Sequence, residues 1–350
     1  MAKRQSLFTT VAHATRIDSV AHATRITRFA HATRITKLVP TLALAVSLSL
    51  AAAACGGDSS DEVQNVDTTV SAVETTLAAE FPVTVGDLTL EAEPQRVVSM
   101  SATATEMLFA VGAGDKVVAV DNFSNFPADI ESLPKVDAYQ PSVEAISELE
   151  PDLVIISYDP GNFVDQLNAL AIPVFAAYAV ANLDGAYEQM KQLGALTGQA
   201  EEAAVVVNTM RSEIDAIVAS VTKQDPPLTY FYELDPTLYS VTTNTFIGSV
   251  MAQFGLVSIA DGVQEGNNYP QLSAEVIVEK NPDLIFLADV KCCAQSAATV
   301  AEREGWSVLR AVNNGSIVEL DDDVASRWGP RLVDLMKQVA AAIETLKSGS

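Results

Sequence analysis

Histidine is almost absent from this 350-residue sequence, and its placement excludes several kinds of chemistry. The three histidines all fall in the first 54 residues: His13, His22 and His31. Residues 55–350 therefore cannot carry Ser-His-Asp or Cys-His catalysis, an H-E-x-x-H zinc site or a histidine-rich metal site. Cysteine is equally scarce: Cys55, Cys292 and Cys293 are the only three, and none has the C-x-x-C spacing of a zinc or redox site.

Positive charge is also scarce beyond the N-terminal region. The formal net charge is −24, but residues 1–54 hold seven Lys or Arg and one acid, which leaves −30 for residues 55–350. Such an acidic surface repels phosphate backbones, so we do not expect a nucleic-acid partner. A hydrophobic content of 49% with 19% charged residues is typical of a folded protein, and the length allows two domains.

The N-terminal 54 residues have the character of a targeting segment. The motif A-H-A-T-R-I occurs three times at a nine-residue period, starting at Ala12, Ala21 and Ala30. Two readings remain open: translated DNA upstream of the true start, or an unusually long basic n-region. The apolar run at 38–54 behind this basic flank predicts the hydrophobic core of a signal peptide.

Cys55 directly follows Ala52-Ala53-Ala54 and precedes Gly-Gly-Asp-Ser-Ser, which resembles a bacterial lipoprotein cleavage box, although position 52 is Ala instead of the usual Leu. The alternative is an ordinary secretory signal that is cut near a cysteine. We expect lipidation of Cys55, with the acidic, Ser/Thr-rich segment 55–80 as a flexible tether. The protein is then expected on the extracytoplasmic side, anchored to the cell membrane by lipid.

A fifteen-residue pattern occurs twice from position 81 onward. Residues 142–156 read S-V-E-A-I-S-E-L-E-P-D-L-V-I-I, and residues 273–287 read S-A-E-V-I-V-E-K-N-P-D-L-I-F-L. In each copy a serine is expected to cap a short helix, a proline to end it, and Asp-Leu to open a buried parallel strand. This repetition predicts two lobes of similar build.

The remaining pattern is β-α-β alternation, which predicts parallel sheets flanked by helices. Thr103-x-x-Glu106 is expected to form a capping box at the start of one helix. The stretch Gln199–Val221 lacks Pro and Gly and predicts one long helix that links the lobes. The expected division beyond the tether is an N-terminal lobe at 81–198, a linking helix at 199–225 and a C-terminal lobe at 226–350.

Several segments resemble one family, the substrate-binding proteins of ABC importers for cobalamin, iron–siderophores and haem. The resemblance rests on P-Q-R-V-V-S-M-S-A-T-A-T-E-M-L-F-A-V-G (94–112), on the first repeat copy, on F-I-G-S (246–249), on the second copy, and on R-W-G-P-R (327–331). It implies an α/β fold of two Rossmann-like lobes, joined by one long helix, with the ligand cleft between them.

The same resemblance implies a membrane partner. In that family a glutamate at the start of one helix in each lobe docks into the permease dimer, and Glu144 and Glu275 match those positions. Charge pairs of this kind fix the orientation of a complex. The plainer alternative is that each glutamate only complements its own helix dipole. We expect a monomer that docks to an ABC importer permease dimer.

Loops at strand ends that face the cleft supply the candidate ligand residues. They are Ser101, Asn122, Phe123, Tyr139, Gln140, Tyr232, Asn244, Phe246, Arg327, Trp328 and Arg331. Aromatic rings offer flat surfaces to a large chelate, and the two arginines could bind carboxylates or catecholates. The alternatives are a salt bridge from the arginines to residues 321–323, and core packing for Tyr139.

The resemblance around residues 327–331 implies a ferric siderophore as the first expected ligand, followed by cobalamin and then haem. No resident cofactor or metal is expected. Cys292 and Cys293 could form a vicinal disulfide or remain two free thiols, and the sequence leaves both open. No enzymatic activity is expected. The alternatives of another class are a signalling lipoprotein without transport and a carboxylate-dependent hydrolase using acids such as Glu106 or Asp121.

Overall fold

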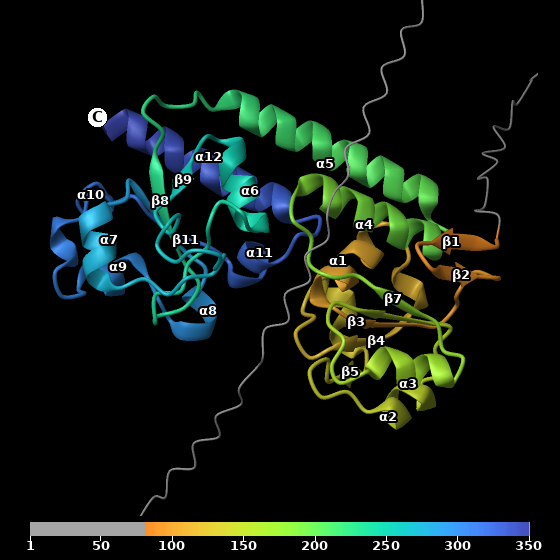
Figure 1. Ribbon diagram of the computed structural model, residues 1–350. Coiled ribbons are helices and arrows are strands. Elements are labelled where there is room, and N and C mark those ends of the chain that lie inside the picture. The colour runs from red at the N-terminus through yellow and green to blue at the C-terminus, as the bar shows by residue number, and fades with distance from the viewer. Residues whose placement is uncertain (1–80, 350) are drawn as a thin grey trace, which may run out of the picture. The chain divides into compact units, whose positions relative to one another are not determined.

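The computed structural model describes residues 81–349, which belong to one compact unit (Figure 1). The predicted signal peptide, the A-H-A-T-R-I repeat, Cys55 and the tether lie outside the described residues. None of the helices in residues 81–349 is both long and apolar enough to cross a membrane.

The first part of the described chain builds a five-stranded parallel sheet in the order β5-β4-β3-β6-β7, preceded by an antiparallel hairpin of β1 and β2. The strands are β1 Val83–Val85, β2 Leu88–Leu90, β3 Val97–Met100, β4 Val117–Asp121, β5 Lys135–Val136, β6 Leu153–Ile156 and β7 Val174–Ala176. The helices are α1 Ala102–Ala110, α2 Val143–Glu148, α3 Phe163–Ala169 and α4 Leu183–Leu196, with 3₁₀ turns η1 Gly114–Lys116 and η2 Ala128–Ser132. This is the N-terminal lobe.

Both faces of that sheet are covered, as the continuous apolar strands predict. Side chains alternate along a strand, so Val98 and Met100 pack with Phe163 of α3, whereas Val97 and Ile155 pack on the opposite face with α1 and α4. The polar residues at the carboxyl ends of the strands are therefore brought together at one edge.

The second part builds a four-stranded parallel sheet in the order β11-β10-β8-β9. Its strands are β8 Thr229–Glu233, β9 Val257–Ser258, β10 Leu284–Leu287 and β11 Ile317–Glu319. Its helices are α6 Phe246–Gln253, α7 Ala274–Lys280, α8 Val290–Cys293, α9 Ala297–Ala301, α10 Arg310–Asn313, α11 Asp322–Ser326 and α12 Leu332–Gly349, with the 3₁₀ turn η3 Trp306–Val308. This is the C-terminal lobe.

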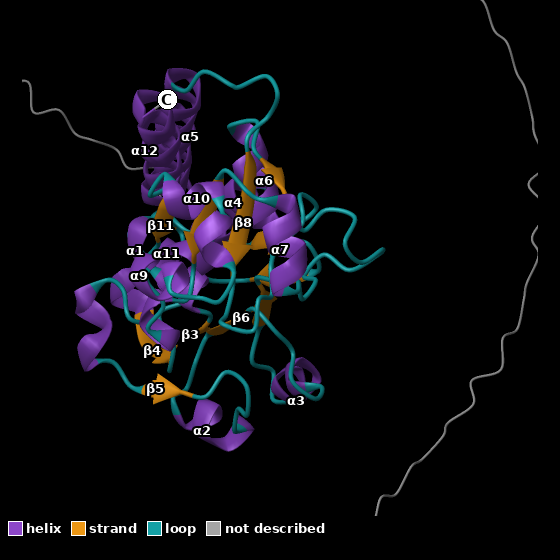
Figure 2. Cartoon of the chain, turned by 90° about the vertical axis from the view of Figure 1, so that its left-hand side faces the viewer, coloured by secondary structure: helices purple, strands orange, loops and turns teal. Residues whose placement is uncertain are grey.

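The long helix α5, Ala200–Ser220, connects the two sheets along the chain, one residue shorter at each end than predicted. It packs against α4 and against the final helix α12, which lies beside it in both views (Figures 1 and 2). Gly194 of α4 allows the close approach, because a Cβ there would overlap the Cβ of Ala203 on α5. One hydrophobic core runs from the first sheet through these helices to the second. The α/β fold with two parallel sheets is thus confirmed, whereas the exact domain bounds stay a prediction.

The two repeat copies have the predicted structure. Ser142 and Ser273 cap α2 and α7 by accepting the N–H groups of Ala145 and Val276. The aspartate after each proline has a role that the sequence did not reveal. Asp152 Oδ2 accepts the N–H groups just before β3 (2.8 and 3.0 Å), and Asp283 Oδ2 accepts the first N–H of β8 (2.8 Å). Each aspartate therefore fastens its strand to the neighbouring strand.

The predicted capping box at Thr103 and Glu106 is wrong. Ser101 caps α1 instead, accepting the N–H of Ala104 at 3.3 Å, so Thr103 already lies inside the helix. Glu106 then falls on the second turn, too far from the helix end to reach an N-cap N–H, and its side chain is buried.

Candidate functional site

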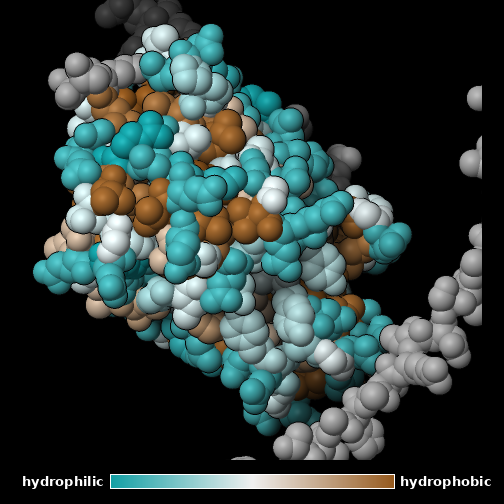
Figure 3. Space-filling view, turned by 60° about the vertical axis from the view of Figure 1, so that its left-hand side comes forward, coloured by the Kyte–Doolittle hydropathy of each residue, from teal (hydrophilic) through white to brown (hydrophobic). Residues whose placement is uncertain are grey.

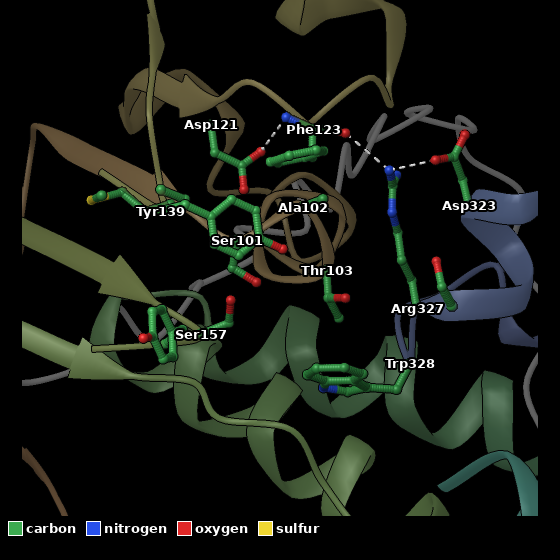
Figure 4. A pocket seen from close by; sticks show the side chains of 14 residues that line it. Ser101, Ala102, Thr103, Asp121, Phe123, Tyr139, Ser157, Asp323, Arg327 and Trp328 are labelled. Atoms are coloured by element: carbon green, nitrogen blue, oxygen red, sulfur yellow. Dashed lines mark hydrogen bonds and ion pairs between the residues drawn. The ribbon is translucent and has the colours of Figure 1, made fainter. Parts of the chain in front are cut away.

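A pocket of about 330 Å³ lies where the strand ends of the N-terminal lobe meet the segment around α11 (Figure 4). Ten of its fourteen lining residues come from the N-terminal lobe and four from the C-terminal lobe. They are Met100, Ser101, Ala102, Thr103, Asp121, Phe123, Ala138, Tyr139, Ser157 and Tyr158, with Asp323, Ser326, Arg327 and Trp328. The N-terminal residues follow strands β3, β4, β5 and β6, at the carboxyl edge where open parallel sheets bind ligands.

Two aspartates turn the chain so that aromatic rings project into this pocket. Asp121 Oδ1 accepts the N–H groups of Phe123 and Ser124 (3.0 and 2.6 Å). Asp137 Oδ1 likewise accepts the N–H of Tyr139 at 2.8 Å. Such Asx turns reverse the chain directly after a strand. The rings of Phe123 and Tyr139 meet edge to face with centroids 5.3 Å apart, and both side chains are more than half exposed.

The two candidate arginines bind acidic side chains of the protein itself. Glu106 on α1 accepts Arg327 Nη1 at 2.8 Å and Arg331 Nε at 3.0 Å. Glu106 is only 2% exposed, so this ion-pair group joins the two lobes inside the protein. Hydrogen bonding to Glu106 raises the pKa of Arg331. Arg327 also donates to Asp323 Oδ1 at 2.7 Å, which agrees with the salt-bridge alternative that the sequence left open.

Trp328 forms the wall of the pocket opposite Phe123 and Asp121, and a contact with the other lobe fixes its side chain (Figure 4). Its indole N–H donates to Oε1 of Gln189 on α4 at 2.7 Å. Phe246 packs behind it, with ring centroids 6.3 Å apart. The orientation of the indole is therefore set by the N-terminal lobe and by α6.

Five of the eleven candidate ligand residues line the pocket: Ser101, Phe123, Tyr139, Arg327 and Trp328. Asn122, Gln140 and Asn244 are exposed but lie outside its lining, Phe246 supports Trp328, and Arg331 holds Glu106. These placements leave their roles in binding as predictions.

Tyr232 requires a correction, because the structure buries it completely. Its ring packs with Phe286, and its hydroxyl donates to the carbonyl oxygen of Ala325 at 2.9 Å. Burial raises the pKa of Tyr232. The residue lies on the central strand β8, where an aromatic side chain belongs to the core and does not reach the pocket.

Sequence reasoning missed several lining residues, chiefly Asp121, Ser157, Tyr158 and Asp323. Ser157 and Tyr158 directly follow the apolar strand β6, so the carboxyl-edge rule could have found them. Asp121 ends β4 two residues before an aromatic residue, which is a local turn signal. Glu106 carried no readable signal, because its partners are 221 and 225 residues away.

The two glutamates predicted to dock to a permease are exposed. Glu144 and Glu275 lie in the first turns of α2 and α7, at equivalent places in the two lobes. Hydrogen bonds from its own N–H and from Ser142 lower the pKa of Glu144, and those from Ser273 and its own N–H lower that of Glu275. Both carboxylates are thus ionised at neutral pH.

Cys292 and Cys293 end the one-turn helix α8 as free thiols, so the disulfide alternative is not present in this structure. Within residues 81–349, no group of three or more His, Cys, Asp or Glu side chains could hold a metal ion.

Comparison with known proteins matches residues 97–324 to the model of the family described as periplasmic binding protein. This chain belongs to that family. A cobalamin-binding protein of Halobacterium salinarum is 33% identical over 278 residues, covering 76% of this chain and 75% of the relative. The ABC transporter substrate-binding lipoprotein YvrC of Bacillus subtilis is 28% identical over 276 residues, covering 75% and 86%.

Among solved structures, the periplasmic vitamin B12-binding protein BtuF of Vibrio cholerae superimposes with a TM-score of 0.62 at 26% identity, covering 73% of this chain and 98% of BtuF. The family resemblance inferred from the sequence is confirmed, and with it the two-lobed architecture.

Proposed function

We propose that this protein is a lipid-anchored extracytoplasmic receptor that binds a corrinoid and delivers it to the permease of an ABC importer. Membership of the periplasmic binding protein family supports a role in capture and delivery of a small molecule. The cobalamin-binding relative and BtuF support the choice of ligand class. The ferric siderophore favoured by the sequence becomes the second choice.

One observation carries the choice of a corrinoid: Arg327, the arginine that lines the pocket, is already paired with Glu106 and Asp323, and Arg331 is paired with Glu106. The other polar side chains of the lining carry hydroxyls or carboxylates, and they are those of Ser101, Thr103, Asp121, Tyr139, Ser157, Tyr158, Asp323 and Ser326. The carboxylates and hydroxyls can accept hydrogen bonds from the carboxamide N–H groups around a corrin ring, whereas an anionic catecholate or carboxylate finds no unpaired cation among the lining residues. The rings of Phe123, Tyr139 and Trp328 provide flat apolar surfaces for the macrocycle.

Haem is the third candidate, and two exposed tyrosines of the pocket support it. Tyr139 is 64% and Tyr158 57% exposed, and a tyrosinate can ligate haem iron. The propionates of haem would, however, lack a free cation among the lining residues. The hydrolase alternative is weakened, because Glu106 is buried between two arginines and is not open to a substrate.

Titration of the purified protein with cyanocobalamin, ferric siderophores and hemin tests this proposal. Trp328 lies in the pocket, whereas Trp306 is 1% exposed, so saturable quenching of intrinsic fluorescence reports mainly on Trp328. Saturation by cyanocobalamin at micromolar or tighter Kd is expected. Saturation by a ferric siderophore or hemin alone would overturn the ligand choice. Absence of binding to all three, checked by calorimetry, would overturn the receptor itself.

We propose that Glu144 and Glu275 bind the permease during delivery. With one acidic contact from each lobe, the two residues would fix the orientation of the protein on its partner. Replacing both residues by Ala should leave ligand affinity unchanged, because they lie outside the pocket lining, and should reduce transport in cells at least tenfold. Glu148 is an exposed acid on the same helix as Glu144, so E148A is the matched control. Normal transport by the double variant would rule out this docking mode.

The anchor belongs to the same proposal. Cys55 would carry the lipid and residues 56–80 would tether the monomeric receptor to the membrane. The surface of the body is mostly hydrophilic, with hydrophobic patches between polar residues, in the view of Figure 3. Labelling of cells with a radioactive fatty acid should mark the protein, and a C55S variant should lose the label. Equal labelling of both would exclude the anchor.

A further inference from the structure

Glu106 binds two guanidinium groups, of which that of Arg327 lines the pocket. It is 2% exposed and lies on α1, the helix that begins at the pocket with Ser101 and Ala102. Its Oε1 accepts from Arg327 and its Oε2 accepts from Arg331. The negative charge of Glu106 is shared by both guanidinium groups, and the carboxylate of Asp323 gives Arg327 a second partner, so two positive charges meet two negative charges at this end of the pocket.

Arg327 is the arginine that lines the pocket, and four of its five N–H groups have partners. Figure 4 shows two of them, Phe123 and Asp323. Besides Glu106 the partners are Asn125 Oδ1, the carbonyl oxygen of Phe123, and Asp323 Oδ1, at 2.9, 2.9 and 2.7 Å. A ligand carboxylate that approached Arg327 would have to displace one of them.

Asp323 is the partner at the open side of this network, and it stays ionised. Burial opposes its ionised form, but hydrogen bonds from Lys291 and Asn125 and the charge of Arg327 outweigh burial and lower the pKa of Asp323. Lys291 Nζ lies 2.8 Å from Asp323 Oδ2. The negative charge of Asp323 is thus fixed by groups from both lobes.

Around this end of the pocket the acids outnumber the bases. In the part of the chain that the structure describes, the carboxylates are Glu106, Asp121, Asp321, Asp322 and Asp323, and the cations are Lys291, Arg327 and Arg331. An anionic ligand therefore meets net negative charge as well as occupied arginines, and both effects cost binding free energy.

We infer that Glu106 and Asp323 determine specificity: they act as internal counter-ions that occupy the arginines and so select neutral over anionic macrocycles. This inference rests on the proposed function only in taking this pocket as the ligand site. The pocket would discriminate between two ligands of one shape that differ by a single carboxylate. A simple structural role for the ion pairs predicts no such discrimination.

Binding of cyanocobalamin and of its b-, d- and e-monocarboxylic acids, each with one amide hydrolysed, tests the inference in the full chain. The ratio of the Kd of each acid to the Kd of cyanocobalamin is compared in the unaltered protein and in D323N, which removes the negative charge paired with Arg327 but keeps a side-chain oxygen as acceptor. For at least one isomer the preference for the neutral ligand should shrink about tenfold in D323N. If D323N gives the same Kd ratio as the unaltered protein for all three isomers, the inference is overturned.

A matched control separates the local effect from net charge. Asp184 forms an exposed ion pair with Arg211 outside the pocket, at 3.1 Å, so D184N makes the same charge change and should keep the ratio of the unaltered protein. E106Q should shift the ratio in the same direction as D323N, provided that its melting curve shows a folded protein. A shift in D184N equal to that in D323N would contradict the inference.

The outcomes also distinguish this inference from the proposed function. If the unaltered protein binds hemin instead of cobalamin, the same comparison is made with hemin and its neutral dimethyl ester. Binding with an unchanged ratio in D323N would overturn the inference alone. Binding of neither macrocycle would overturn both.

Discussion

The two lobes place polar residues at the same edge of similar sheets, but only one lobe leaves them open to a ligand. In the N-terminal lobe, Asp121 and Asp137 turn the chain so that Phe123 and Tyr139 stand exposed. In the C-terminal lobe, the acids at the ends of β8 and β10, Glu233 and Asp289, are fully buried, and Arg303 covers Glu233 with two hydrogen bonds. Turns held by aspartates thus leave aromatic side chains exposed at the strand ends of the N-terminal lobe. In the C-terminal lobe, the two hydrogen bonds from Arg303 keep the acid at the end of β8 buried.

This difference explains the unequal lining of the pocket. The N-terminal lobe supplies the main ligand surface, and the C-terminal lobe contributes only the segment from Asp323 to Trp328. That segment reaches the N-terminal lobe through Glu106, Asn125 and Gln189. Breaking these contacts should therefore destabilise the molecule more than breaking an exposed ion pair within one lobe.

The largest effect on stability is expected for E106A. It removes the buried carboxylate that both guanidinium groups share, so Arg331 loses its ion-pair partner and Arg327 keeps only Asp323, which should cost about 3–5 kcal/mol of unfolding free energy. Urea unfolding followed by circular dichroism measures this cost. D184A, which removes the carboxylate of an exposed ion pair, serves as the control and should shift the midpoint far less. A loss below about 1 kcal/mol in E106A would mean that the pairs between the lobes are unimportant.

Asp289, buried at the strand ends of the C-terminal sheet, should make the unfolding free energy depend on pH. Burial, and then the neighbouring Glu233 charge, raise the pKa of Asp289 to about 7, against the opposing charge of Arg303. Neither oxygen of Asp289 has a hydrogen-bond partner in the described chain. The folded state therefore holds a proton that the unfolded state releases near pH 4, so stability falls as pH rises from about 4 to about 7 and is level above.

Replacing Asp289 by Asn removes this titration. Relative to the unaltered protein, D289N should gain up to about 3 kcal/mol between pH 4 and pH 8, with most of the gain complete by pH 7. Unfolding free energies at pH 4, 6 and 8 measure it. Asp283, an acid of the same lobe that is hydrogen-bonded to Thr229, should show no such gain in D283N. A constant difference between D289N and the unaltered protein at all three pH values would refute the prediction.

Aromatic substitutions test the asymmetry at the ligand surface itself. F123A and Y139A should each weaken ligand binding about tenfold, because each removes an exposed ring from the pocket. Tyr269, which is 52% exposed in the C-terminal lobe and outside the pocket lining, is the matched control. Calorimetric titration gives the affinities. An equal loss in Y269A and Y139A would show that the C-terminal lobe shares the ligand surface.

Local sequence patterns were sufficient for most of the fold. The repeated Ser-x-Glu helix starts, the Pro-Asp-Leu strand openings and the uninterrupted stretch 199–221 are all decided within one or two turns of chain, and the structure has the elements they predict. Ser101 and Phe123 were found because residues that follow strands gather at one edge of a parallel sheet.

Contacts between residues far apart in the sequence decided the features that sequence analysis failed to predict. Whether Glu106 caps its own helix or binds Arg327 depends on packing between segments more than 200 residues apart. Tyr232 has the residue type of a ligand contact, but only the position of β8 inside the sheet decides that its ring points into the core. The direction of a side chain on a buried strand is settled by tertiary packing.

A crystal structure of the protein grown with cyanocobalamin would test the central claim most directly. We predict that the corrin ring lies against Phe123 and Tyr139, with Trp328 on its other side and Glu106 still paired with both arginines. A ligand held by the C-terminal lobe, or one whose acidic group has displaced Asp323 or Glu106 from Arg327, would contradict the account.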